Sequence, residues 1–297
     1  MSPLLSALVL APFQNEVDPN RLPIGRKGEQ TVAVGEVTDL GKGRPATAKD
    51  VAEAARGKRF VFLGENHGTT AHQQMEADVI QALLDDGREV VVGLEMYTRP
   101  KQDWLDQWSQ GKLSEVDFLA KSDWKGQWGF DYGFYRPVFE VARKFKVPMV
   151  ALNVPRDWVR VVGREGYAAL TTEQKLQLPA NLGEPAPDHK SVFNALMGGH
   201  PMAGPRGDNM YSAQVLWDQG MADTAVKYLE RMPTSPKTVF VVIAGSGHVM
   251  YGQGINGRIE KQKAGKGVTL VMIQSPESTK VSKGLADFVY VTKPVKG

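Results

Sequence analysis

The 297-residue sequence contains no cysteine. This absence excludes disulfides, thiolate metal sites, cysteine nucleophiles and a lipid anchor on an N-terminal cysteine. It leaves the compartment open, because chains without cysteine fold in oxidising and reducing surroundings alike. Long apolar runs are also missing: the one within residues 1–13 is shorter than the roughly 20 residues that a membrane-spanning helix needs. The sequence therefore predicts no transmembrane segment.

Positive charge exceeds negative charge by only a small amount. The formal net charge is +3, and Lys and Arg alternate with Asp and Glu without a long basic run. Nucleic-acid-binding proteins concentrate basic residues on one face, so we expect no nucleic-acid partner. With 42% hydrophobic and 23% charged residues, the composition is that of an ordinary globular chain with one large core or two modest ones.

The first 45 residues differ in composition from the rest. The apolar run within residues 1–13 is typical of the hydrophobic core of an export signal, which favours a periplasmic or other extracytoplasmic location. A strand or a disordered tail stays open as an alternative, since no Lys or Arg precedes Arg21 and Pro12 directly follows Ala11. The rest of this segment is rich in Gly, Pro and charge and predicts an extended arm, with one alternating piece at 31–37 suited to an edge strand. We expect residues 46–297 to form a single domain.

The chain is organised around an apolar stretch, Phe60-Val-Phe-Leu-Gly-Glu-Asn-His-Gly68, that stops abruptly at Glu65 and His67. A short β-branched and aromatic run that ends in Gly is typical of a buried strand entering a tight turn. Two later runs end in the same way, at Glu95 and at His248. Helical spacing between such strands implies right-handed crossovers. We therefore predict an α/β fold with a mainly parallel sheet flanked by helices.

A long segment between the third and fourth core strands lacks any strand pattern. From Arg156 to about residue 235 it shows helical stretches, broken at 182–187 and at 198–205 by Gly and Pro. We expect a helical insertion, or lid, over about 156–235. Two further strands, at 268–273 and 288–291, complete the predicted sheet.

Side chains that suit acid and base chemistry follow three of the predicted strands. Ligands bind at the carboxyl edge of a parallel sheet, so these side chains are expected to share one cleft. Carboxylates and imidazoles together suit general acid and base catalysis, or the binding of a divalent metal ion. Alternatively, Glu65 caps the helix that follows the first turn, and His67 has a structural role only. The four candidates, for catalysis and for metal binding alike, are Glu65, His67, Glu95 and His248.

The stretch 124–135 is aromatic at six of its twelve positions and contains three glycines. So much ring surface must pack on something. Either it packs in the core beside the insertion, or it lines a site for a large planar apolar ligand, where Tyr can also bind iron. His189 and His200, in the insertion, are expected near the surface or behind the direct ligands.

Six motifs follow one another between about Lys58 and Asn256. They are Gly64-Glu-Asn-His67, Gly93-Leu-Glu-Met96, Tyr135-Arg-Pro137, Ala151-Leu-Asn-Val-Pro-Arg156, Ala213-Gln-Val-Leu-Trp-Asp-Gln-Gly-Met-Ala222 and Ala244-Gly-Ser-Gly-His-Val249. In this order they resemble the ChaN-like family of haem-binding proteins, which is associated with bacterial iron uptake. The pattern of Glu and His at strand ends is also similar, more distantly, to that of erythromycin esterases and of TraB and Tiki proteins, which include hydrolases and metal-dependent peptidases.

The resemblance implies a haem-binding protein of bacterial iron or haem uptake, with the porphyrin in a cleft at the carboxyl edge of the sheet. By analogy with the family, a tyrosine is the axial ligand, and Tyr97, Tyr135 and Tyr251 are the candidates. Arg156, in a family motif, is a further candidate for cofactor binding. A homodimer or a closed lid would cover the haem, or another planar apolar molecule in its place. The chain departs from the lipoprotein members of the family, since it has no cysteine to carry a lipid.

The same resemblance implies a second functional class, an esterase or peptidase. Two carboxylates and two imidazoles can hold a divalent ion and lower the pKa of its bound water towards neutrality. Alternatively, His67 can activate water directly while Glu65 orients the ring. The hydrolase is therefore the alternative to the haem-binding protein.

Overall fold

The computed structural model describes residues 17–179, 182, 186–198, 204–233 and 235–294. The export signal expected within residues 1–13 lies outside this part of the chain, and so does His200.

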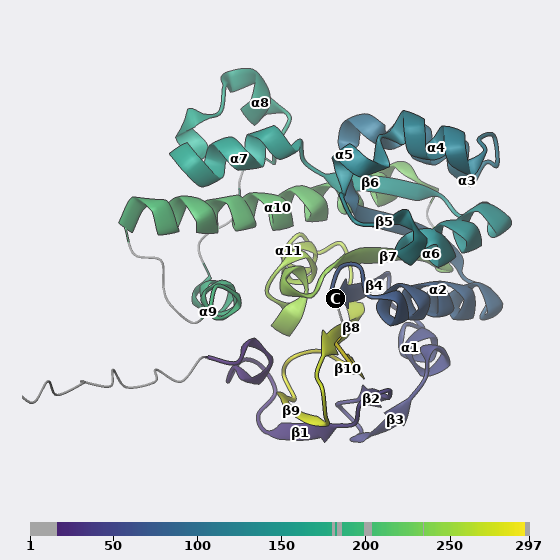
Figure 1. The fold of residues 1–297 in the computed structure, drawn as a ribbon, viewed down its shortest axis with the longest axis vertical. Helices are drawn as coiled ribbons and strands as arrows, with labels where there is room; N and C mark the ends of the chain where they lie inside the picture. The colour runs from purple at the N-terminus through teal and green to yellow at the C-terminus, as the bar shows by residue number, and fades with distance from the viewer. Residues whose placement is uncertain (1–16, 180–181, 183–185, 199–203, 234, 295–297) are drawn as a thin grey trace, which may run out of the picture.

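The centre of the molecule is a sheet of eight strands in the order β3-β2-β10-β8-β4-β7-β5-β6 (Figure 1). From β10 to β6 every neighbouring pair is parallel, whereas β2 and β3 pair antiparallel. The predicted α/β fold with a mainly parallel sheet is therefore confirmed. The strands of this sheet are β2 (Val37–Asp39), β3 (Arg44–Ala46), β4 (Phe60–Glu65), β5 (Glu89–Thr98), β6 (Met149–Asn153), β7 (Thr238–Gly245), β8 (Gly267–Gln274) and β10 (Phe288–Thr292).

Helices cover both faces of the sheet, which explains why its central strands are apolar throughout. In β4, Val61 and Leu63 pack in the core under α1, α2 and α6, whereas Phe60 and Phe62 pack in the core under α10 and α11. Figure 1 shows these two helical layers on opposite sides of the sheet. The helices of the first layer are α1 (Ala48–Ala54), α2 (Thr70–Asp85), α3 (Gln102–Ser109), α4 (Glu115–Ser122), α5 (Trp124–Gln127) and α6 (Tyr132–Phe145); those of the second are α10 (Gly204–Arg231) and α11 (Ile255–Lys261).

The N-terminal arm is built into the domain rather than extending from it. Its strands β2 and β3 lengthen the main sheet through β10, and β1 (Glu29–Val32) pairs with β9 (Thr279–Ser282) in a separate two-stranded sheet. The edge strand expected at 31–37 is therefore two strands in two sheets. Gly35, at φ +86°, lies between them, in a conformation that favours glycine.

Helices fill the segment between β6 and β7, as expected for the insertion. They are α7 (Arg156–Glu165), α8 (Thr172–Leu176), α9 (Pro187–Leu196) and α10. The second half of α10 is part of the sheet's own cover, because Met221, Ala225 and Leu229 pack in the core against the strands. Short 3-10 turns occur at Pro19–Arg21, Arg99–Lys101, Tyr167–Ala169, Ser246–His248 and Met250–Gly252.

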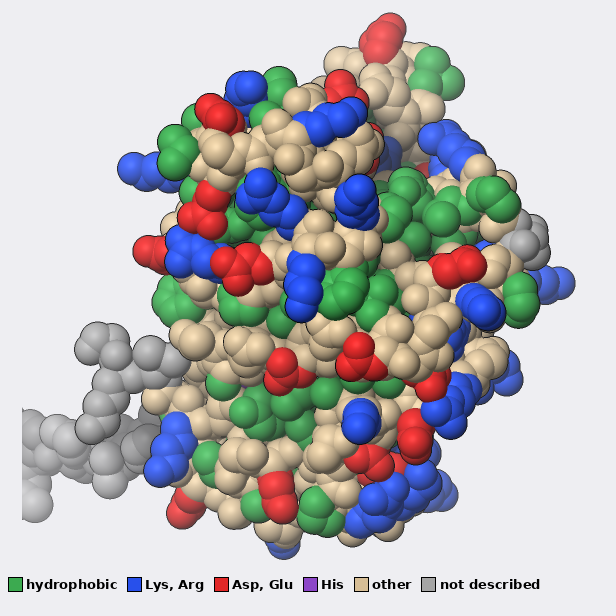
Figure 2. Space-filling view, turned by 90° about the vertical axis from the view of Figure 1, so that its right-hand side faces the viewer, with side chains coloured by type: hydrophobic (Ala, Val, Ile, Leu, Met, Phe, Trp, Pro, Cys, Tyr) green, Lys and Arg blue, Asp and Glu red, His purple; other side chains and the backbone are tan. Residues whose placement is uncertain are grey.

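The surface is mixed in charge. On the face that Figure 2 turns towards the viewer, acidic and basic side chains lie close to one another between apolar ones, without an extended field of one sign in that view. Within the described ranges, no helix is both long and apolar enough to cross a membrane.

Candidate functional site

The carboxyl ends of three neighbouring strands form the site. β7 lies between β4 and β5 in the sheet, and Glu65 at the end of β4 is in register with Gly245 at the end of β7. Glu95 of β5 reaches the same place, where its Oε2 accepts a hydrogen bond from the Gly245 amide at 2.6 Å. The 3-10 turn that follows β7 then carries His248. The structure thus brings together the four residues that the sequence places at strand ends.

Glu65 and His67 form a carboxylate–imidazole pair. His67 Nδ1 donates to Glu65 Oε1 at 2.6 Å, and the Tyr135 hydroxyl donates to the same oxygen at 2.7 Å. Gln73, on α2, donates its amide to the other oxygen, Oε2. Gly68, at φ +66°, provides the sharp turn that folds His67 back towards the strand it follows.

The environment of His67 favours its charged form. Burial lowers the pKa of this imidazole, but the hydrogen bond to Glu65 and the charge of Glu95 outweigh burial, so the pKa lies above the usual 6.5. The ring packs against Trp128, with centroids 4.5 Å apart, and against Phe130 at 5.5 Å. Its side chain keeps 29% of its surface exposed, and no hydrogen bond to its Nε2 is found among the described residues.

His248 lies between two carboxylates. Its Nδ1 donates to Asp218 at 2.5 Å, and its Nε2 is 3.3 Å from Glu95 Oε1. Burial alone would raise the pKa of both carboxyls, but the imidazolium holds each of them at about 2. Burial would likewise lower the pKa of His248, yet the charges of Glu95 and Asp218 raise it well above its usual value. His248 is therefore a fixed cation at neutral pH.

Asp218 continues this network into the insertion. Its second oxygen accepts a hydrogen bond from His189 Nε2 at 2.7 Å, and His189 Nδ1 is 2.9 Å from the Tyr211 hydroxyl. His189 belongs to α9, while Asp218 and Tyr211 belong to α10. Because all three side chains are buried, the network ties both helices to the turn after β7.

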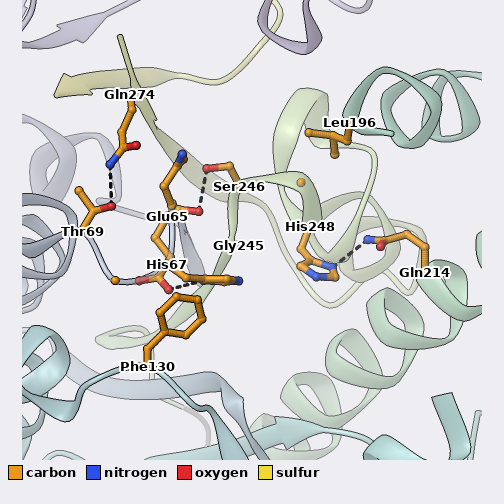
Figure 3. A pocket seen from close by; sticks show the side chains of 13 residues that line it. Glu65, His67, Thr69, Phe130, Leu196, Gln214, Gly245, Ser246, His248 and Gln274 are labelled. Atoms are coloured by element: carbon orange, nitrogen blue, oxygen red, sulfur yellow. Dashed lines mark hydrogen bonds and ion pairs between the residues drawn. The ribbon is translucent and has the colours of Figure 1, made fainter. Parts of the chain in front are cut away.

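An open pocket of about 670 Å³ lies above these groups. Figure 3 shows His67 and His248 on either side of Gly245, with Phe130 beside His67 and Leu196 on the side of His248. Leu196 comes from the last turn of α9, so the insertion supplies one wall and the aromatic stretch supplies the other. The other lining residues are Glu65, Asn66, Gly68, Thr69, Gln214, Ser246, Gly247 and Gln274.

Comparison with known proteins identifies the family of the chain. A sequence model of the family described as haem-binding uptake, Tiki superfamily, ChaN matches residues 51–259. The chain belongs to this family. No protein of curated function matches the chain.

One solved structure shares the fold of this ChaN family member, and two others are similar to it at lower scores. A ChaN of Campylobacter jejuni, described with cofacial haem binding, has 19% identity and a TM-score of 0.62, over 86% of this chain and 95% of that one. An erythromycin esterase mutant in its open conformation has 12% identity and a TM-score of 0.48, over 86% and 83%. A MARTX toxin effector domain from Vibrio vulnificus has 17% identity and a TM-score of 0.41, over 84% and 40%.

The three tyrosines suggested by the likeness to the ChaN family do not line the pocket. Tyr135 lies beneath it, bonded to Glu65. The hydroxyl of Tyr97 is 2.8 Å from Ser122 in the core of the first helical layer. The hydroxyl of Tyr251 accepts from the Leu22 amide and donates to the Pro19 carbonyl, both at 2.9 Å, so it anchors the N-terminal arm. Burial raises the pKa of all three hydroxyls, which opposes ionisation.

Arg156, the remaining candidate from the ChaN motifs, begins α7 close to the site. Its guanidinium stacks over Trp128, 5.8 Å from the ring centroid. Burial lowers its pKa, while the charge of Glu95 acts in the opposite direction. No ion pair of Arg156 is found in the described part of the chain. The guanidinium is therefore available to a ligand.

The geometry gives no support to a divalent metal site. Where the structure describes the chain, no group of three or more His, Asp or Glu side chains is arranged to hold a metal ion. Of the four groups expected to bind one, His248 and Glu95 are paired with each other.

Sequence reasoning missed Asp218. It placed His189 near the surface or behind the direct ligands, and the structure has it behind His248, bonded to Asp218. A signal for Asp218 was present, because this carboxylate stands between buried Leu216 and Met221 on the apolar side of a helix. A charge at such a position requires a partner. The sequence could not show which partner, since His248 is thirty residues away along the chain.

Proposed function

We propose that this protein binds haem in the pocket at the carboxyl ends of β4 and β7. Family membership supports haem as the ligand class. The observation that carries the proposal for this chain is the state of His67: one ring nitrogen is fixed by Glu65, and the other is without a hydrogen bond among the described residues.

This arrangement is the one that proteins use to present a histidine to a metal. Metal-binding histidines commonly donate their second ring nitrogen to a carboxylate, which fixes the tautomer and makes the free nitrogen a better ligand. His67 would accordingly be the axial ligand, through Nε2. Haem would supply the iron that an uptake protein carries, and the protein supplies the ligand and its orientation.

The walls of the pocket suit a planar apolar molecule with charged edges. Phe130 and Leu196 keep 40% and 39% of their surface exposed, so each offers an apolar face to a ligand. Arg156 does not line the pocket itself, but its guanidinium is close enough to feel the charge of Glu95, and its planar shape suits a carboxylate such as a haem propionate. The pocket volume of about 670 Å³ lies within the range of roughly 300–1,000 Å³ that is usual for sites of small molecules and cofactors.

Titration of the purified protein with haemin tests the proposal. We expect a saturable shift of the Soret band that is lost in His67→Ala. Glu65→Gln should weaken binding by about 10–100-fold, the usual effect of removing the hydrogen-bond partner of a metal-binding histidine. Binding should also weaken as the pH falls through the raised pKa of His67, because only the neutral imidazole binds iron.

Ligation of the haem iron by a tyrosine stays a prediction. The same haemin titration distinguishes it from ligation by His67. Tyr97→Phe, Tyr135→Phe and Tyr251→Phe should each leave the Soret spectrum unchanged if His67 is the ligand. Tyr290→Phe, on β10, is the matched control. Loss of the charge-transfer bands in one of the first three variants, with His67→Ala unaffected, would overturn the assignment to His67.

A hydrolase is the second candidate, and the Glu65–His67 pair favours it. A carboxylate that orients an imidazole leaves the outer nitrogen able to take a proton from water, while His248 holds a fixed positive charge nearby. The test is hydrolysis of ester, lactone and peptide substrates by the wild type, His67→Ala and Glu95→Gln. If hydrolysis is lost in both variants while haemin still binds to them, the protein is an enzyme. If none of the substrates is hydrolysed by the wild type, the haem-binding proposal stands alone.

Extracytoplasmic location and a homodimer that covers the haem belong to the same proposal. The N-terminal residue of the native mature protein, measured by mass spectrometry, tests export. Light scattering after size-exclusion chromatography, with and without haemin, tests the dimer. A molecular mass that stays monomeric at saturating haemin would contradict the dimer. In that case α9 and the helices beside it would cover the ligand.

A further inference from the structure

Beneath the Glu65–His67 pair lies a buried polar cluster that the preceding proposals do not use. Glu76 and Gln73 lie one turn apart on α2, both with 0% of their surface exposed. Neither oxygen of Glu76 has a hydrogen-bond partner among the described residues, nor has Oε1 of Gln73. The Glu76 carboxyl nevertheless lies close to Glu65, whose charge acts on it.

The hydrogen-bond inventory of this cluster lacks a donor. With Glu76 ionised, the unpartnered atoms are three oxygens, and all of them are acceptors. An ionised carboxylate without a partner is among the costliest groups to bury. A proton on Glu76 removes the buried charge and turns one of the three acceptors into a donor.

Glu65 has room for that donor. A carboxylate offers about four acceptor sites. His67 and Tyr135 use the two on Oε1, and Gln73 uses one on Oε2. The fourth is free, and the Glu76 carboxyl lies within hydrogen-bonding reach of Glu65.

We infer that Glu76 is a permanently neutral carboxylic acid whose hydroxyl donates to this cluster and thereby positions Glu65. Burial, and then the charge of Glu65, raise the pKa of Glu76 well above its usual range, which agrees with this assignment. Glu76 is thus a positioning residue that acts on His67 through Glu65. With this hydroxyl, four donors surround Glu65 and fix the orientation of the carboxylate that accepts the hydrogen bond of His67. This inference holds for either ligand class, so a failure of haem binding would not affect it.

Infrared spectroscopy of the full-length protein labelled with ¹³C-glutamate tests the inference directly. We expect a carboxylic acid C=O band, shifted by the label, that persists at pH 8. The band should disappear in Glu76→Gln, which keeps the shape and a donor, and should remain in Glu140→Gln, an exposed glutamate on α6. Absence of the band from the wild type at pH 8 would mean an ionised Glu76, balanced by a cation, and would overturn the inference.

A second measurement separates a neutral from an ionised Glu76 through His67. If Glu76 is neutral, Glu76→Gln exchanges one neutral donor for another, and the pKa of His67 measured by NMR should match that of the wild type. If Glu76 is ionised, the substitution removes a nearby negative charge and should lower the pKa of His67 by about one unit or more. A lowered pKa would therefore contradict the assignment, even in a variant that folds normally.

Discussion

His248 shows how much a single side chain in this site depends on its neighbours. Two carboxylates keep it charged, and in return it keeps both of them ionised although they are buried. A buried ion pair of this kind contributes little more to folding stability than apolar side chains of the same volume. Removal of one partner, however, leaves the other charge buried without compensation. Asp218 is the partner whose loss is most damaging, because His189 also depends on it.

We predict that Asp218→Asn destabilises the protein by about 3 kcal/mol at pH 7. The amide cannot balance the imidazolium of His248, and it replaces a shared carboxylate with a group that accepts on one atom only. Urea unfolding measures the effect. Asp208→Asn, on the same helix, is the matched control: Asp208 is 67% and its partner Lys190 46% exposed, so the change there should stay within about 0.5 kcal/mol. Equal effects of the two substitutions would refute the role given to Asp218.

At the scale of elements, α10 owes its place to a glycine. A Cβ on Gly220 would lie 2.5 Å from Val154 Cγ1, so only glycine allows α10 to approach the end of β6 this closely. The approach matters for the site, since Asp218 stands two residues before Gly220 on the same helix. Gly163, in α7, is different: its nearest neighbour would be the Cβ of Ala213 at 3.6 Å, an ordinary contact.

The same substitution should therefore have opposite effects in the two helices. Gly220→Ala is expected to destabilise by about 1–3 kcal/mol through overpacking. Gly163→Ala is expected to stabilise by about 0.5–1 kcal/mol, because alanine loses less conformational freedom in a helix. Thermal unfolding of the two variants beside the wild type provides the comparison. A stabilising Gly220→Ala would show that the contact with Val154 relaxes without cost.

At the scale of the whole molecule, buried ionisable groups set the range of pH in which the fold is stable. His72 is 0% exposed; its Nδ1 accepts from the Asn66 amide at 3.0 Å, and its Nε2 donates to Thr292 Oγ1 at 2.9 Å. The ring thus joins the end of β4 to β10. Burial lowers its pKa to about 4, and the charge of Glu65 opposes this only in part.

We predict that His72 makes the fold sensitive to mild acid. Its pKa is about 4 in the folded state and about 6.5 when unfolded, so its contribution is complete above pH 6.5 and is lost as the pH falls towards 4. The slope of unfolding free energy against pH over this range should be smaller in His72→Gln than in the wild type. The two slopes are compared, rather than the free energies, because the substitution also changes stability by an amount that does not depend on pH. Equal slopes in the variant and the wild type would contradict the prediction.

The ion pairs around His248 change the stability of the fold mainly outside the pH range of His72. Glu95 and Asp218 have pKa values of about 2 in the fold, so their contribution is present above their unfolded pKa values and disappears as the pH falls towards 2. His248 has a raised pKa, so its contribution is complete below about 6.5 and is lost as the pH rises through that raised pKa.

Local sequence patterns predicted the core strands and helices because these signals depend on near neighbours. Apolar runs indicated the parallel strands. The start of α1 is local in the same way, since Thr47 forms a capping box with Asp50 three residues later. The small strands of the arm were harder to predict. β2 and β3 have three residues each, too few for a periodic pattern. β2 is held by pairing with β10 some 250 residues away, and β3 is held by pairing with β2.

By itself, the sequence determined an α/β protein with Glu65, His67, Glu95 and His248 at strand ends, because burial of parallel strands dictates both their apolar runs and the polar turns that end them. The tertiary structure alone decided the strand order β4-β7-β5, which makes these ends neighbours. It also decided that the three candidate tyrosines point into the protein and that Asp218 and Glu76 stand behind the histidines. The physical reason is the range of the forces: propensity and periodicity act within a few residues, whereas a buried charge or hydroxyl finds its partner wherever packing has left one.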